Sequence, residues 1–183
     1  MKKALIVYWS ATGNTEKVAF AIRDGLKDAG VDVNLVKTKG IEELDYFQYD
    51  LVCVGSPVHQ FHLPEPMSKF LKGMFTKYGN EKRILPNAPT VKGKHALIFC
   101  TWAGGHTGVD EALPAVKYMG QFFAHVGIEV VDEWYVPGEL FSGEAQEVAH
   151  YNVSGRLGDI RGRPTGEELK KVRLDASKLG KKI

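Results

Sequence analysis

Short apolar runs that alternate with stretches of helical spacing constrain the fold of this chain more than any other feature. Residues 4–9, 51–55 and 96–101 are almost continuously apolar, which is the pattern of strands buried on both faces of a parallel sheet. Residues 31–36 and 128–136 are two further strand candidates. Because parallel strands need long crossover connections, usually helices, these runs predict an α/β fold.

The segments between the strand candidates have the periodicity of amphipathic helices. Helices are expected over residues 14–29, 66–77 and 108–126, and a last helix over residues 165–183. Right-handed crossovers place such helices on both faces of the sheet. We therefore predict a doubly wound five-stranded parallel sheet with the strand order 2-1-3-4-5.

The length of 183 residues suits a single domain over residues 1–183. The one irregular connection covers residues 137–164, with a short helix expected near residues 144–150. Long connections of this kind are usually functional or disordered. Four side chains of this connection have two possible roles. They either cover the edge of a ligand or build a subunit interface. They are Glu139, Phe141, His150 and Tyr151.

Composition excludes several classes of function. A formal net charge of +2 gives no argument for nucleic-acid binding, and the basic C-terminal residues form either a solvated helix face or a docking patch for an acidic partner. Cys53 and Cys100 lie in apolar runs and are expected in the core, and without a Cys-x-x-Cys motif no iron–sulfur cluster is predicted. No metal site is expected. No apolar stretch approaches the length of a membrane span, so we expect a cytoplasmic protein.

The turn after the first strand has the composition of a phosphate-binding site. It reads Ser10, Ala11, Thr12, Gly13, Asn14 and Thr15 and leads directly into the first helix. A helix N-terminus exposes unpaired N–H groups and the positive end of the helix dipole, and the hydroxyls add neutral donors. Gly13 allows close approach of the backbone. The alternative is a polar loop whose side chains only cap the helix.

Two further loops are expected at the same edge of the sheet, because ligands of doubly wound folds bind beyond the carboxyl ends of the strands. The third strand is followed by Pro57, Val58 and His59, with Phe61 and His62 shortly after. The fourth strand ends in Thr101, Trp102, Ala103, Gly104 and Gly105, followed by His106. Loops rich in turn residues and aromatics suit a flat heteroaromatic ring.

These three segments resemble those of the flavodoxin family. Residues 10–15 are similar to the Ser/Thr-x-Thr-Gly-x-Thr phosphate signature, and the loops after the third and fourth strands resemble the two that flank the flavin ring. The resemblance implies a flavodoxin-like fold with FMN as cofactor. The phosphate would contact residues 10–15, and the ring would lie between residues 57–59 and 101–105.

Other features depart from the small acidic carriers of that family, since the sequence pI is near 8.4. Trp102 is the candidate for stacking on one face of the ring, and the other face offers only His59 or Phe61. These departures leave open which redox partner the protein has and what its redox potential is.

Three functions follow from the resemblance and the residues. The first is an FMN-binding carrier of electrons between a reductase or ferredoxin and an acceptor enzyme. The second is an FMN-dependent NAD(P)H:quinone-type oxidoreductase acting on a small acceptor, which the loop of Gly104, Gly105 and His106 favours. The third is a non-redox module that binds another phosphate ligand. An oligomer is compatible with each of them.

Overall fold

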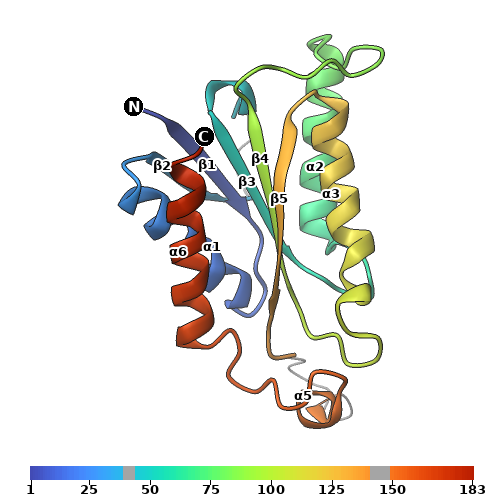
Figure 1. The fold of residues 1–183 in the computed structure, drawn as a ribbon. Coiled ribbons are helices and arrows are strands. Elements are labelled where there is room, and N and C mark those ends of the chain that lie inside the picture. The colour runs from blue at the N-terminus through green and yellow to red at the C-terminus, as the bar shows by residue number, and fades with distance from the viewer. Residues whose placement is uncertain (39–43, 141–148) are drawn as a thin grey trace.

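The computed structural model describes residues 1–38, 44–140 and 149–183. All strands of that part form one parallel sheet in the order β2-β1-β3-β4-β5 (Figure 1), which confirms the predicted topology. The strands are β1 (Lys3–Tyr8), β2 (Asp32–Lys37), β3 (Leu51–Pro57), β4 (His95–Trp102) and β5 (Glu129–Pro137).

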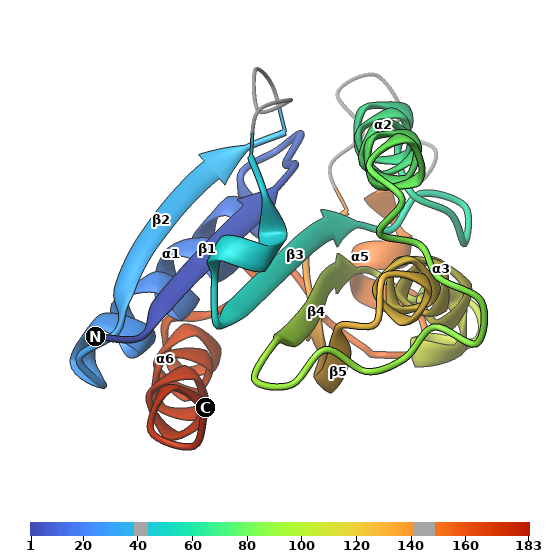
Figure 2. The same ribbon diagram turned by 90° about the horizontal axis from the view of Figure 1, so that it is seen from above.

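Helices cover both faces of the sheet, as the crossover rule requires. Viewed from above, α1 and α6 lie on one side of the sheet and α2 and α3 on the other (Figure 2). The helices are α1 (Asn14–Asp28), α2 (Glu65–Asn80), α3 (Leu113–His125), α5 (Tyr151–Ser154) and α6 (Gly166–Gly180). The described residues also form two 3₁₀ turns, η1 (Tyr46–Gln48) and η2 (Gly108–Glu111).

The helix predicted over residues 108–126 differs from the structure at its start. Its first turn is the 3₁₀ helix η2, and the α-helix begins only at Leu113, with a proline in its first turn. Proline is favoured there because its missing N–H is not needed for an intrahelical bond. The helix predicted over residues 66–77 extends further at both ends, to Glu65 and Asn80. Residues 144–148 of the expected short helix lie outside the described residues.

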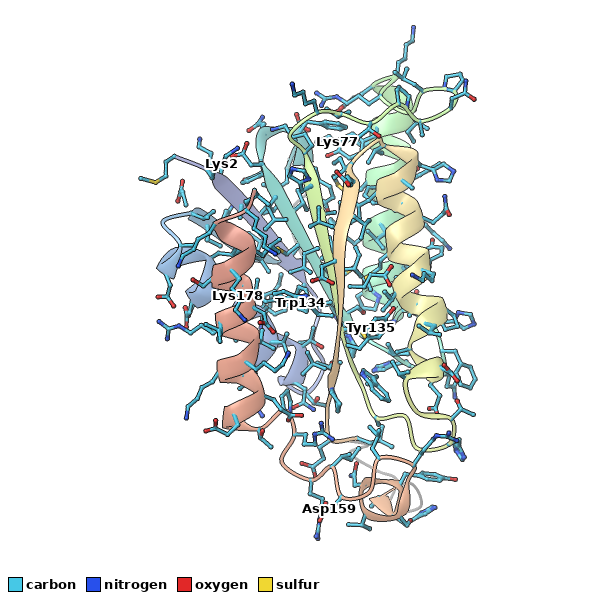
Figure 3. The ribbon with its side chains drawn as sticks, in the orientation of Figure 1. Lys2, Lys77, Trp134, Tyr135, Asp159 and Lys178 are labelled. Carbon is cyan, nitrogen blue, oxygen red and sulfur yellow. The ribbon has the colours of Figure 1, made fainter. Side chains whose placement is uncertain are left out.

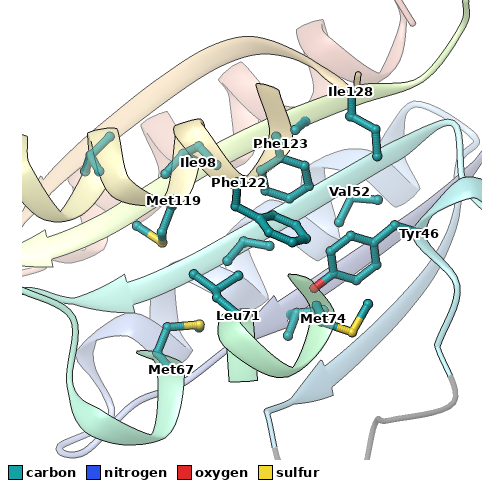
Figure 4. Packing of buried hydrophobic residues seen from close by; sticks show 14 of the residues in the cluster. Tyr46, Val52, Met67, Leu71, Met74, Ile98, Met119, Phe122, Phe123 and Ile128 are labelled. Carbon is teal, nitrogen blue, oxygen red and sulfur yellow. The ribbon is translucent and has the colours of Figure 1, made fainter. Parts of the chain in front are cut away.

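The core on the α2 and α3 face is rich in aromatic rings (Figure 4). The Tyr46 ring stacks on Phe123 with centroids 5.8 Å apart, and the Tyr46 amide donates to the Tyr78 hydroxyl at 2.7 Å. A buried Tyr hydroxyl needs such a partner. These contacts account for the C-terminal extension of α2 past Lys77.

The core on the opposite face joins the sheet to α1 and α6. It includes Ile6 of β1, Ile22 of α1 and Ala176 of α6, all without exposed surface. Side chains of the edge strand β5 alternate between the two cores: Trp134 points toward α6 and Tyr135 toward α3 (Figure 3). This alternation is the period of two expected for a strand.

Both cysteines are buried free thiols, which confirms their predicted place in the core. Burial raises the pKa of the Cys53 and Cys100 thiols above the usual range, so neither is a reactive thiolate at neutral pH. Among the described residues, no helix has the length and apolar character needed to cross a membrane.

Candidate functional site

The carboxyl ends of β1, β3 and β4 meet at one edge of the sheet around a small hollow. Its volume is about 110 Å³. The turn after β1 and the loops after β3, β4 and β5 all contribute to its wall. The lining residues are Ser10, Ala11, Thr12, Asn14, Thr15, Pro57, Val58, His59, Thr101, Trp102, Ala103, Gly138, Glu139 and Leu140.

Helix α1 begins at this hollow without a side-chain cap. Gly13 precedes the helix with φ +95°, a left-handed conformation that suits glycine. The Gly13 amide donates to the Ser10 hydroxyl at 3.1 Å, which closes the turn. Because no side chain among the described residues caps α1, the helix presents first-turn N–H groups and its positive dipole end to an anion.

Thr15 and Thr101 fix the turn to the end of β4. Their hydroxyl oxygens lie 2.7 Å apart, and both residues are buried. In such a pair one hydroxyl donates to the other, so the second hydroxyl hydrogen remains available for another acceptor. The pair therefore holds the N-terminus of α1 at a set distance from the loop after β4.

Asn14 is buried at the centre of the site. Its Nδ2 donates to the carbonyl of Glu139 at 3.0 Å, while its Oδ1 has no hydrogen-bond partner among the described residues. Buried polar atoms are nearly always paired. The unpaired Oδ1, in a residue that lines the hollow, suits a ligand that supplies a donor such as a hydroxyl group.

The loop after β3 makes a tight hairpin beside the hollow. His59 and His62 exchange two backbone hydrogen bonds of 2.9 Å around Gln60 and Phe61. The His59 ring packs edge-on against Trp9, with centroids 5.9 Å apart. Burial lowers the pKa of His59 below its usual 6.5, so this side chain presents a neutral imidazole to the site at pH 7.

The loop after β4 is shaped by a close contact between Gly104 and Trp102. A Cβ at Gly104 would lie 2.1 Å from the Trp102 ring, and Gly104 has φ +59°. Trp102 is 7% exposed and belongs to the core cluster under α2 and α3. Its Nε1 is buried without a partner in the described part of the chain. Stacking of this ring on a flavin stays a prediction.

The structure brings together most of the predicted site residues. All but Gly13, Gly104 and Gly105 line the hollow, and Gly13 and Gly104 shape the turn and the loop that enclose it. The wall formed by residues 138–140 was not among the predicted cofactor-binding residues. Its signals were the start of a long irregular connection directly after β5, and Glu139 as a candidate cover. Phe141 lies outside the described residues.

Three aromatic rings gather next to the loop after β4. His106 lies 4.7 Å from Tyr151, and His150 lies 4.0 Å from the same ring, measured between centroids. Gly105 packs under Tyr151, where a Cβ would come within 3.3 Å of the side chain. The amides of His106 and Thr107 donate to Glu111 at 2.7 Å, which fixes this part of the loop.

A larger groove of about 760 Å³ lies between β5 and α6. Most of its charged side chains have ion-pair partners. Asp175 pairs with Lys171 and Lys178 within the groove, and Glu133 and Glu168 pair with Lys117 and Arg163 outside its lining. It therefore lacks the convergent free donors found at the start of α1. Among the described residues, no group of three or more His, Cys, Asp or Glu side chains is placed to hold a metal ion.

The residues of the hollow fit the phosphate end of a mononucleotide. The uncapped start of α1 supplies N–H donors, and Ser10 and Thr12 supply hydroxyls. The volume is below the ~300–1,000 Å³ of pockets that enclose whole small molecules. It therefore suits the phosphate and adjoining atoms, with a ring lying along the edge formed by the loops after β3 and β4.

Comparison with known proteins points to one family. The family model described as a flavodoxin domain matches residues 5–86. A flavodoxin from Megasphaera elsdenii is 32% identical over 100 residues, which are 55% of this chain and 65% of that protein, just under two thirds of its length. An NAD(P)H dehydrogenase (quinone) from Archaeoglobus fulgidus is 26% identical over 177 residues, covering 81% of this chain and 87% of that protein.

A solved structure shows the same fold over the whole length. The flavodoxin from Streptococcus pneumoniae TIGR4 superposes with a TM-score of 0.65 at 21% identity, covering 99% of each chain. Together with the strand order and the turn at the start of α1, these matches confirm the resemblance noted in the sequence. The chain is similar to flavodoxins in sequence over residues 5–86 and in fold over 99% of its length.

Proposed function

We propose that this chain is an FMN-binding redox protein that carries electrons between a reductase or ferredoxin and an acceptor enzyme. The observation that supports it most is the uncapped N-terminus of α1, opening into a hollow lined by Ser10, Thr12 and Thr15. A phosphate group is the ligand that such a helix start favours. The two buried free thiols fit the reducing conditions of the cytoplasm, where we expect the protein to act.

The residues of the site would bind and orient the cofactor, and FMN would supply the electron-transfer chemistry. Backbone N–H groups at the start of α1, with the Ser10 and Thr12 hydroxyls, would hold the phosphate. Residues 57–59 and 101–103 would flank the ring, and the neutral His59 adds no charge next to it. The Thr15–Thr101 pair keeps the phosphate end and the ring end in fixed register.

The cofactor assignment is tested by reconstitution. The purified protein should carry, or take up, one equivalent of a flavin that acid precipitation releases as FMN. Binding of another phosphate ligand with no uptake of FMN would instead support the non-redox module.

A second function is supported by the rings of His106, His150 and Tyr151. They lie beside Gly105, at the end of the loop expected to flank the flavin, and both histidines are exposed. Aromatic faces bind flat acceptors, and histidine and tyrosine can donate protons to their oxygens. With the likeness to an NAD(P)H dehydrogenase (quinone), this arrangement favours an FMN-dependent NAD(P)H:quinone-type oxidoreductase.

Stopped-flow mixing of the FMN-loaded protein with NADH or NADPH separates the two functions. A carrier served by a reductase or ferredoxin should show no rapid loss of flavin absorbance with either nucleotide alone. Rapid bleaching by one of them, followed by recovery when a quinone is added, would favour the oxidoreductase.

A further inference from the structure

Residues 138–140, called the edge segment below, continue β5 across the carboxyl edge of the sheet. They line the hollow together with the phosphate turn and the loops after β3 and β4. The Gly138 amide donates to the Trp102 carbonyl at 2.8 Å, and the Glu139 amide donates to the Arg163 carbonyl at 3.0 Å. The edge segment is therefore held by parts of the chain that are distant from it in sequence.

Asn152 makes two side-chain hydrogen bonds to the edge segment. Its Oδ1 accepts from the Leu140 amide at 2.8 Å, and its Nδ2 donates to the Leu140 carbonyl at 2.9 Å. One side-chain amide thus satisfies both backbone groups of one residue, in the way a neighbouring strand would. Asn152 is 6% exposed, so water does not replace these bonds easily.

The position of Asn152 is itself fixed. Its carbonyl accepts from the Ile160 amide at 2.7 Å, and Ile160 is 1% exposed. Arg156 donates its amide to the Gly105 carbonyl at 3.0 Å, which joins the same part of the chain to the loop after β4. Asn152 therefore connects the edge segment to a region anchored at two places.

The other side of the edge segment contacts the phosphate turn. Asn14 donates from Nδ2 to the Glu139 carbonyl at 3.0 Å. A Cβ at Gly138 would lie 3.2 Å from that same Nδ2, so the glycine permits the close approach. The edge segment thus lies between two asparagines, one in the predicted phosphate site and one in α5.

We propose that Asn152 is a positioning residue that holds the edge segment against the phosphate turn and thereby sets how long bound FMN is retained. Asn152 does not line the hollow, so it acts through Leu140 and Glu139. The inference rests on the proposed FMN-binding function. It goes beyond that function by assigning closure of the site to a residue outside it.

The test measures the rate at which FMN dissociates from the loaded protein. After dilution, the recovery of free-flavin fluorescence reports this rate. In Asn152→Leu both bonds to Leu140 are lost, and we expect dissociation to be on the order of tenfold faster. The association rate should stay unchanged, because the phosphate turn remains in place. Asn152→Asp keeps the acceptor for the Leu140 amide and should give an intermediate rate.

Tyr78→Phe is the matched control. It removes a buried hydrogen bond to the Tyr46 amide, 2.7 Å in length, in the α2–η1 contact. It should lower stability without changing FMN dissociation. If Asn152→Leu does not fold, the rate of FMN dissociation from Asn152→Asp decides whether the inference holds.

If the Asn152 variants release FMN at the same rate as the wild type and only their stability is lowered, the inference is overturned and the FMN-binding function is left intact. A wild-type protein that does not bind FMN would overturn both. Faster dissociation in the Asn152 variants alone would support the inference, and equally faster dissociation in Tyr78→Phe would contradict it.

Discussion

Gln60 and Phe61 form the most strained turn beside the candidate site. Their φ angles are 47° and 71°, a left-handed conformation that favours glycine or asparagine in two-residue hairpin turns. Each such residue costs on the order of 1 kcal/mol or more. Strain of this kind clusters at ligand sites, and here it lies in the loop expected to flank the flavin ring.

Phe61→Gly should therefore stabilise the protein. We expect the free energy of unfolding to rise by about 0.5–1 kcal/mol, because glycine at this position would adopt the same φ without strain. Phe61 is 51% exposed, so little packing is lost. Urea denaturation gives the measurement. Phe75→Gly is the control: this residue is also exposed but lies in α2, where glycine should cost about 1 kcal/mol. Equal losses in both variants would contradict the account.

At the scale of elements, α1 and α6 approach each other most closely at Gly25. A Cβ there would lie 2.1 Å from the Arg173 carbonyl oxygen and 2.7 Å from the Ala176 Cβ. The contact is completed by Arg173, whose guanidinium pairs with Asp28 at 2.6 Å. Only glycine permits this approach, which brings the C-terminal helix onto the sheet.

Gly25→Ala should force the two helices apart. We expect a loss of about 2–3 kcal/mol in the free energy of unfolding, as in other overpacked cores. Gly73→Ala is the matched control, because a Cβ at this α2 position meets nothing within 4 Å. There alanine should stabilise by about 0.5–1 kcal/mol. A neutral Gly25→Ala would show that the interhelical contact is looser than described.

The start of α6 carries a capping box whose stability depends on pH. The Thr165 hydroxyl accepts from the Glu168 amide at 3.2 Å, and the Glu168 carboxylate accepts from the Thr165 amide at 2.8 Å. Burial alone would raise the pKa of Glu168, but hydrogen bonds from Arg163 and Thr165 hold it below its usual 4.5. The ionised form is therefore the one that stabilises the fold.

Because the pKa of Glu168 is lower in the folded state, its contribution is present above about pH 4.5 and is lost as the pH falls through the folded value. Glu168→Gln should thus lose less stability than the wild type between about pH 6 and about pH 3. Urea denaturation at several pH values measures this difference. Equal losses of stability on acidification in the wild type and in Glu168→Gln would contradict the role assigned to Glu168.

For the molecule as a whole, the buried parallel strands were predicted within one or two residues, because their apolar runs are encoded locally. The turn around Gly13 was also recognised, because its residues are consecutive in the sequence. The start of α3 was missed, since the choice between 3₁₀ and α in residues 108–113 depends on how η2 packs. The wall at residues 138–140 was only partly foreseen, because Asn14 contacts Glu139 across 125 positions of sequence.

The most direct test of the whole account compares the affinities of FMN and riboflavin for the purified protein by fluorescence titration. If the start of α1 binds the phosphate, FMN should bind at least about a hundredfold more tightly, as expected for several hydrogen bonds to a charged group. Thr12→Ala removes one exposed hydroxyl of the turn and should weaken FMN about tenfold while leaving riboflavin unchanged. Equal affinities for the two flavins, with no effect of Thr12→Ala, would contradict the assigned site.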